Sequence, residues 1–372
     1  MLAGPYCGLL LADLGAEVIK VESHEGDIAR SIGGQTVGGH NVYFASLNRD
    51  KKSVALDLAD PEERAEFDAL VATADALVCN LRPRAIRKLG LTYKALAPIN
   101  PKLVCVALTG YGLDGPLVDD PAYDYVIQAL TGIMELTGDP DGPPTKAGYS
   151  AVDNSSGMAA ALGLLAKIVE GKGGQVDVAM YDVMISQLNY LAAAWLNGGD
   201  RPRRHEGSSH PYIVPAQLFP TANHWLCIFI THDRFWKAFC QAIDRSEWIE
   251  DPAFRTMRAR HENRQKVTAA IEEVLKTRTT EEWITRLKPT GIVVSQLLTL
   301  DRALSGEQVA ARGLIRDIAV EGGVVRTVGN AIKWGDAAPS MPPPRLGEHN
   351  NMFRSDRVAS LIERRRLGAH DE

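Results

Sequence analysis

Asp153 stands at the start of a long run of small and apolar residues and is the first candidate for chemistry. Asn154, Ser155 and Ser156 follow it, and residues 159–166 carry no charge. The pattern predicts a buried helix with Asp153 as its N-cap, a position at which Asp is strongly preferred. Asp153 is then either a structural cap or a rigidly held carboxylate. In the second case the helix N-terminus would keep it ionised and offer N–H groups to an oxyanion.

Two other places combine polar residues with the ends of predicted elements. Tyr123 and Asp124 lie on a helix predicted at 121–137, as a core aromatic beside a solvated acid or as part of a site. Residues 80–82 (Asn-Leu-Arg) follow a short strand, where a phosphate-bearing ligand would sit. The basic residues after them are alternatively a solvated helix face. These basic residues are Arg84, Arg87 and Lys88.

The composition is that of an ordinary globular protein large enough for two domains. The chain has 372 residues, of which 45% are hydrophobic and 23% charged, and its net charge is −5. It has no basic stripe, so nucleic acid is not a favoured partner, and no apolar run predicts a membrane span. The five cysteines are scattered without a CxxC pair, which predicts a reduced, cytoplasmic protein. The nine histidines show no ligand spacing, so no metal site is predicted.

Strands and helices alternate along the first half of the chain. This order predicts an α/β fold whose large domain is a Rossmann-like, doubly wound and mostly parallel sheet with ligands at the carboxyl ends of its strands. A Gly-x-Gly-x-x-Gly match at 110–115 does not predict a dinucleotide site, because Pro116 and an Asp-Asp-Pro sequence separate it from any helix. The strands are predicted at 16–22, 52–58, 76–79, 102–108 and 175–180, and an irregular loop at 24–52.

A polar Gly/Pro-rich stretch divides the chain. Residues 1–196 are predicted to form the large domain, 197–216 a linker and 217–310 a smaller α+β domain, followed by a C-terminal segment at 311–372. A helix at the very start precedes the first predicted strand. Since a sheet of this kind usually begins with a strand, we expect that a first strand is missing from this start.

Short motifs distributed along the chain resemble those of the family III CoA-transferases. This family contains formyl-CoA transferase, carnitine CoA-transferase and α-methylacyl-CoA racemase. No single motif is decisive, but their order and spacing together are highly specific. The matching segments are 2–5, 11–22, 48–57, 80–83, 153–157, 173–178 and 346–349.

The resemblance implies a catalytic site with Asp153 as the catalytic aspartate, and we assign Tyr123 and Asp124 to the same site. It also implies that CoA lies across the large domain as a substrate, with no permanently bound cofactor. Two subunits would form an interlocked homodimer, with the C-terminal segment returning to the large domain. The implied CoA-binding positions are Leu2, Ala3, Ser23, Leu56, Asp57, Leu58, Ala59, Asn80, Leu81, Arg82, Lys88 and 121–124.

Three features depart from the family pattern. The family's first strand is absent from this sequence. Ser23 replaces an Arg of some members, which removes one expected phosphate contact. The Gly-rich loop with which formyl-CoA transferase covers its active site has no counterpart between residues 205 and 225.

The chemistry implied by the resemblance is transfer of CoA from an acyl-CoA to a small carboxylic acid. Asp153 would carry first the acyl group, as a mixed anhydride, and then CoA, as an aspartyl thioester. The alternative within the family is racemisation at the α-carbon, which needs an acid and a base of suitable pKa. The racemases carry His-Asp where this chain has Tyr123-Asp124, and Tyr is a poor base at neutral pH. A non-catalytic CoA-binding homologue is the third possibility.

Overall fold

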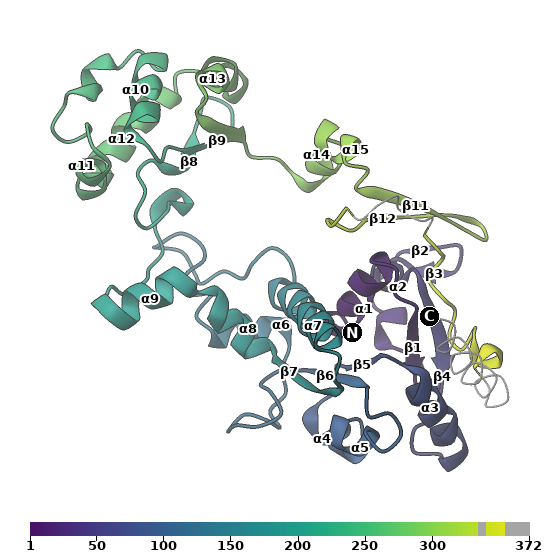
Figure 1. Cartoon of the computed structure of the whole chain (residues 1–372). Coiled ribbons are helices and arrows are strands. Elements are labelled where there is room, and N and C mark those ends of the chain that lie inside the picture. The colour runs from purple at the N-terminus through teal and green to yellow at the C-terminus, as the bar shows by residue number, and fades with distance from the viewer. Residues whose placement is uncertain (334–339, 354–372) are drawn as a thin grey trace. The chain divides into compact units, whose positions relative to one another are not determined.

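The computed structural model describes residues 1–333 and 340–353 (Figure 1). The chain divides into two compact units. Unit 1 contains residues 1–131, 148–189 and the described residues from Glu307 onward, and unit 2 contains 132–147 and 190–306. Parts of the predicted C-terminal segment, 334–339 and 354–372, lie outside the described residues.

Parallel strands form the framework of unit 1, as predicted. β1 (Val18–Glu22) pairs with β4 (Lys51–Ala55) in one sheet. β6 (Val104–Thr109) lies between β5 (Ala76–Cys79) and β7 (Gly174–Ala179) in a second sheet, and every residue of β6 is buried. No ladder joins these two sheets within the described residues. The fold is therefore mixed α/β with two parallel sheets.

Helices follow most of these strands, and local sequence signals fix their ends. Asp60 caps α3 by accepting from Glu62 N and Glu63 N at 2.9 and 3.1 Å, and Pro61 occupies its first position. The helices of unit 1 are α1 (Ala3–Asp13), α2 (Val42–Asn48), α3 (Pro61–Thr73), α4 (Pro83–Lys88), α5 (Tyr93–Leu96), α6 (Asp124–Leu130), α7 (Ala151–Glu170), α8 (Met180–Gln187) and α15 (Glu307–Ala311). Helix α9 (Asn189–Gly198) begins at the boundary between the units.

The predicted loop at 24–52 is wrong in part, because it contains α2 and several short elements. These are η1 (Ile28–Arg30), β2 (Thr36–Val37) and β3 (His40–Asn41). Asn41 starts α2 by accepting from Phe44 N at 3.1 Å. Two later strands of unit 1, β11 (Ile315–Val320) and β12 (Gly323–Val328), form an antiparallel hairpin. Helix caps and packing fix these short elements. They were therefore not predicted from a composition rich in Gly and Asn.

Helices α1 and α7 pack closely side by side (Figure 1). A Cβ atom at Gly157 of α7 would lie 2.8 Å from the carbonyl oxygen of Ala3 and 3.0 Å from the ring of Tyr6. Only glycine therefore allows this approach. Helix α7 ends at Gly171, whose φ of 74° is the left-handed conformation expected of a C-terminal glycine.

The C-terminal segment binds the free edge of β4 in unit 1. His349 N donates to Ser53 O at 2.9 Å, and the Asn350 side chain bonds both the N–H and the C=O of Ala55 at 2.9 and 3.1 Å. A short η5 (Asn350–Met352) follows. These bonds satisfy backbone groups that a sheet edge would otherwise expose.

Unit 2 is built on an antiparallel sheet of the order β10–β9–β8. In β9 (Trp225–Phe229) buried and exposed residues alternate, so one face packs on a core that includes Trp236, Phe239 and Trp283. Its other strands are β8 (Ala216–Pro220) and β10 (Val293–Gln296). Its helices are α10 (Asp233–Ala242), α11 (Met257–Glu262), α12 (Arg264–Leu275), α13 (Thr280–Leu287) and α14 (Leu300–Leu304), with η2 (Glu206–Ser208), η3 (Ser246–Ile249) and η4 (Lys288–Thr290).

The predicted linker at 197–216 belongs to unit 2 and is not a free connection. Arg264 donates to Ser209 Oγ at 3.0 Å and to the carbonyl oxygens of His210 and Pro211 at 2.9 and 2.6 Å. The guanidinium of Arg264 thus binds backbone carbonyl oxygens of a Gly/Pro-rich segment whose composition suggested exposure to solvent. Residues 132–147, which we placed in the large domain, also lie in unit 2.

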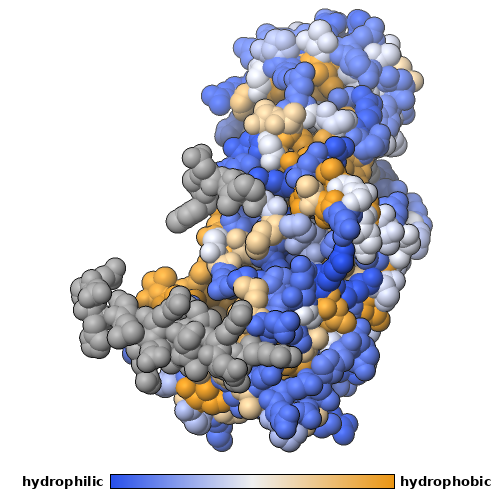
Figure 2. Space-filling model, turned by 90° about the vertical axis from the view of Figure 1, so that its right-hand side faces the viewer, coloured by the Kyte–Doolittle hydropathy of each residue, from blue (hydrophilic) through white to orange (hydrophobic). Residues whose placement is uncertain are grey.

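The length and apolarity of a helix decide whether it could cross a membrane. No helix within 1–333 and 340–353 combines the length and apolarity needed to cross a bilayer. Figure 2 shows one face of the molecule, on which hydrophobic residues in orange lie among hydrophilic ones in blue.

Candidate active site

Asp153 lies in the first turn of α7 and is not its N-cap, contrary to the prediction. The helix begins at Ala151, with Ser150 as the cap residue, and Ser150 makes no side-chain cap hydrogen bond. The sequence pattern therefore located the start of the helix to within three residues. It misassigned the cap because the group that performs this function comes from another helix.

The carboxylate of Asp124, the first residue of α6, closes the N-terminus of α7. Its Oδ2 accepts from Val152 N at 2.8 Å and from Asp153 N at 3.2 Å. Its Oδ1 accepts from the side chain of Gln128, a fully buried residue, at 2.6 Å. Asp124 is thus held by three N–H donors, and it fixes the backbone of Asp153 directly.

The other N–H groups at the start of α7 also have acceptors. Ala151 N donates to Tyr149 O at 2.9 Å, and Asn154 N donates to Ser150 O at 3.0 Å. The N–H groups of residues 151, 152 and 153, three of the four that a helix N-terminus leaves without an intrahelical partner, are therefore satisfied by other groups of the chain. The expectation that these groups would face an oxyanion is wrong, since Asp124 and nearby carbonyls already occupy them.

The electrostatic surroundings of Asp153 also differ from the prediction. Burial, followed by the negative charge of Asp124, raises the pKa of Asp153 to about 6. The helix N-terminus does not keep the pKa low, because its donors bind the second carboxylate. At pH 7 roughly nine tenths of a group with this pKa is ionised. A more basic carboxylate that is still ionised is well suited to act as a nucleophile.

Tyr43 on α2, which the sequence analysis did not single out, lies in the electrostatic surroundings of Asp153. Burial and then the charges of Asp153 and Asp27 raise the pKa of Tyr43, so this phenol lies within electrostatic reach of Asp153. Tyr43 falls in the stretch predicted as an irregular loop, and no periodic pattern marks it. By contrast Tyr123, which precedes α6, is 59% exposed.

Asn80 connects the start of α1 to the sheet. Its Oδ1 accepts from Gly4 N at 3.2 Å, and its Nδ2 donates to Leu108 O at 2.6 Å. A Cβ atom at Gly4 would lie only 2.7 Å from that of Asn80. The structure therefore brings the predicted CoA positions Leu2 and Ala3 next to Asn80, while Ala3 also contacts α7 through Gly157.

The remaining predicted CoA positions lie after β1, β4 and β5, at the carboxyl ends of parallel strands. Leu56 is buried, while Asp57 turns the chain by accepting from Ala59 N at 2.9 Å, and Leu58 lies between them in exposure. Leu81, Arg82 and Lys88 are exposed at and beyond the end of β5, as is Ser23 after β1. Within the described residues, no ion pair holds Arg82 or Lys88. No cluster of His, Cys, Asp and Glu in the described chain could hold a metal ion.

Comparisons with known proteins show which family the chain is similar to. The model of CoA-transferase family III matches residues 1–350. An acetyl-CoA:oxalate CoA-transferase from Acetobacter aceti is 34% identical over 96% of this chain and 93% of its own length. A succinate–glutarate CoA-transferase from Agrobacterium fabrum is 32% identical, covering 94% and 90%. A crystal structure of a CAIB/BAIF family protein from Brucella suis superposes with a TM-score of 0.83 at 33% identity, covering 95% of both chains.

The chain therefore belongs to CoA-transferase family III and is an enzyme of that family. The resemblance that the sequence motifs carried is confirmed.

Proposed function

We propose that this enzyme moves CoA from an acyl-CoA donor to a small carboxylic acid, with Asp153 as the covalent nucleophile. The observation that carries the proposal is a rigid, partly buried Asp153 whose pKa is raised to about 6, next to Asp124, in a family of CoA-transferases. The substrates named for the relatives, such as oxalate and glutarate, support small acids as acceptors. Asp153 serves both half-reactions.

The reaction proceeds in four balanced displacements. The Asp153 carboxylate attacks the thioester carbonyl, the C–S bond breaks, and a mixed anhydride and CoA thiolate form. The thiolate then attacks the Asp153 carbonyl carbon of the anhydride, releasing the donor acid and leaving an aspartyl-CoA thioester. The acceptor carboxylate attacks that thioester and expels the thiolate. The thiolate finally attacks the acceptor carbonyl, which frees the new acyl-CoA and the Asp153 carboxylate.

Other residues position the groups that react. Asp124 anchors the backbone of Asp153 and keeps its carboxylate basic. We assign to Tyr43, whose phenol interacts electrostatically with Asp153, the stabilisation of negative charge that develops beside Asp153. Asn80 orients the start of α1, and the exposed Arg82 and Lys88 supply cationic groups for the phosphates of CoA.

We also propose that two copies of this chain assemble into an interlocked homodimer, which the family resemblance supports. All five cysteines are free thiols, which supports the proposal of a reducing, cytoplasmic location.

Racemisation at the α-carbon is the competing chemistry, and the geometry favours transfer. A racemase needs a second acid or base on the opposite face of the substrate. Both oxygens of Asp124 already accept N–H donors, and Tyr123 is largely exposed. Neither group is therefore well placed to exchange a proton with a substrate.

The test uses purified enzyme in deuterium oxide with a chiral 2-methylacyl-CoA. Without an acceptor acid, we expect no deuterium at the α-carbon, because transfer never breaks that C–H bond. With a panel of small carboxylic acids added, we expect new acyl-CoA species by mass spectrometry. Deuterium exchange at a catalytic rate in the absence of any acceptor would refute transfer as the function.

A further inference from the structure

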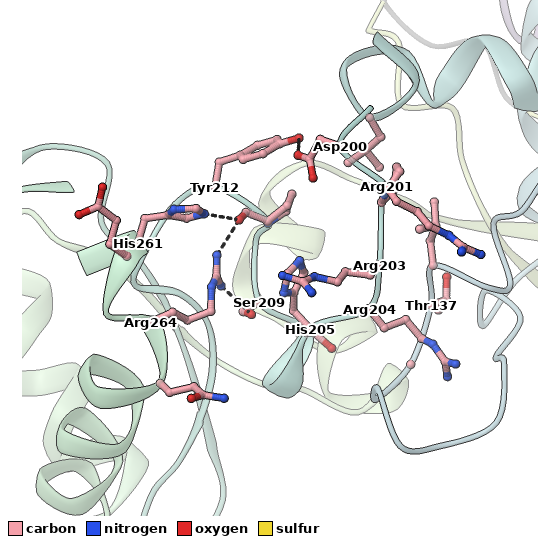
Figure 3. Close-up of a pocket in the computed structure, with 18 of the residues that line it drawn as sticks. Thr137, Asp200, Arg201, Arg203, Arg204, His205, Ser209, Tyr212, His261 and Arg264 are labelled. Carbon is pink, nitrogen blue, oxygen red and sulfur yellow. Dashed lines mark hydrogen bonds between the residues drawn. The ribbon is translucent and has the colours of Figure 1, made fainter. Parts of the chain in front are cut away.

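A basic pocket lies entirely within unit 2 and has no place in the proposed chemistry of Asp153. Its volume is about 750 Å³, and it is formed by parts of 136–138, 200–212 and 261–266 (Figure 3). Its lining includes the cations Arg201, Arg203, Arg204, Arg264 and Lys266. Against these it has the carboxylates Asp200 and Glu262 and the histidines His205 and His261.

The two carboxylates are engaged by other groups. Asp200 Oδ2 accepts from the Tyr212 hydroxyl at 2.9 Å, as the dashed line in Figure 3 shows. Glu262 Oε1 accepts from Arg258, which is not part of the lining, at 2.8 Å. The positive charge of the pocket is thus only partly balanced by its own acids.

Arg203 and Arg264 form the centre of this excess charge. Arg264 is fixed by Ser209 and by two carbonyl oxygens, all of them uncharged acceptors. In Figure 3, Arg203 points toward His205 and Arg264, whereas Arg204 points away from them. Within the described part of the chain neither Arg203 nor Arg264 pairs with a carboxylate.

The protonation equilibria show that these like charges interact. Burial and then the charge of Arg203 lower the pKa of Arg264. Burial and then the charges of Arg264 and Arg203 lower the pKa of His205. This repulsion between like charges destabilises the folded unit, and an anion bound between the side chains would relieve it.

The start of α12 adds to the same field. Asn263 makes no side-chain cap, and no acidic residue lies in the first turn of this helix. The positive end of a helix therefore contributes to a pocket that already has an excess of cations.

We infer that this pocket binds a small molecule bearing two or more oxyanion groups. Guanidinium groups recognise carboxylate and phosphate oxygens by paired hydrogen bonds, so both chemistries fit Arg203. The anion is therefore either a phosphoryl compound or a polycarboxylic acid. The inference does not depend on Asp153, since binding here requires no turnover.

The experiment is calorimetric titration of the full chain in about 0.1 M chloride, with pyrophosphate in one arm and citrate in the other. We expect at least one of them to bind, and the tighter one identifies the source of the anion. Arg203→Ala should weaken that binding by about tenfold or more, because it removes a charged hydrogen-bonding partner. Arg203 is exposed, so this variant should remain folded.

Two control variants make the result specific. Arg255→Ala removes an exposed arginine of unit 2 outside the pocket and should bind within about twofold of wild type. Arg82→Ala tests whether the anion binds instead at the proposed CoA site of unit 1. The inference is overturned if neither anion binds, if Arg203→Ala binds like wild type, or if Arg82→Ala alone abolishes binding.

Discussion

The N-termini of helices α7 and α12 present two opposite solutions to the same electrostatic problem. At α7 the chain supplies its own anion, Asp124, whose carboxylate accepts from Val152 and Asp153. At α12 the first turn carries Arg264 and Lys266, and no side chain caps it. A carboxylate of the protein closes the first terminus, whereas the second has no side-chain cap and no acidic residue in its first turn.

Like charges are crowded in both places, but the consequences differ. The Asp124 carboxylate raises the pKa of Asp153 toward neutrality and so yields a basic yet ionised group. Around α12 the crowding lowers the pKa of Arg264 and of His205. A closed terminus can hold a nucleophile rigidly, whereas an open cationic one has capacity for an external anion.

The largest expected effect comes from removing the nucleophile. Asp153→Ala should lower CoA transfer by several powers of ten, because every displacement passes through this carboxylate. CoA binding by calorimetry and the circular dichroism spectrum should stay close to wild type. A purified variant that retains more than roughly a tenth of the activity would leave Asp153 with a structural function only.

The second effect concerns stability, and its sign follows from the raised pKa. Between its unfolded pKa near 3.9 and its folded pKa of about 6, Asp153 binds more proton in the folded state, so rising pH destabilises the wild type through this group. Asp153→Asn removes that cost, which is at most about 3 kcal/mol.

Thermal unfolding of wild type and Asp153→Asn at several pH values measures this difference. The Asn variant should gain stability relative to wild type as pH rises from about 4 to 7. A difference in Tm that is the same at both ends of this range would show that the carboxylate is not under electrostatic strain.

A third variant converts the closed terminus of α7 into a partly open one. In Asp124→Asn the amide oxygen can still accept an N–H, but the negative charge is gone. We expect about a tenfold loss of rate and an acid limb of the pH–rate profile that moves to lower pH, since the second cause of the raised Asp153 pKa is removed. An acid limb at the wild-type pH would separate Asp124 from the electrostatics of the nucleophile.

The smallest effect is expected at the proposed CoA site. Arg82→Ala should raise the KM for acyl-CoA several-fold with little change in kcat, because the lost contact is present in both ground and transition states. Arg84→Ala, at an exposed position of α4, the helix that Arg82 precedes as N-cap, is the matched control. Equal effects of the two substitutions would indicate that the phosphates of CoA bind elsewhere.

Much of the framework followed from local sequence signals. The start of α3, the end of α7 at Gly171 and the parallel strands all follow from residues adjacent to the element they shape. The motifs 80–83 and 153–157 led to the family, and residues 2–4 and Asn80 are in fact neighbours. Such features are encoded over a few residues, so they could be read directly.

The features that could not be predicted from the sequence depend mainly on residues that are distant along the chain. The cap of α7 comes from Asp124, 29 residues before Asp153, so the pattern at 150–157 assigned capping to the wrong residue. The predicted linker is ordered by Arg264, more than 50 residues away. Tyr43 lies within an apparently irregular stretch, and no periodic signal distinguished it.

The central claim is that Asp153 becomes covalently bonded during turnover, and one measurement tests it directly. Enzyme mixed with acyl-CoA, without an acceptor acid, is quenched with hydroxylamine, digested and analysed by mass spectrometry. We predict an aspartyl hydroxamate on Asp153 that forms only when acyl-CoA is present, because hydroxylamine attacks the anhydride or thioester carbonyl and releases the acid or CoA. If an actively transferring enzyme leaves Asp153 unmodified under these conditions, the covalent account is contradicted.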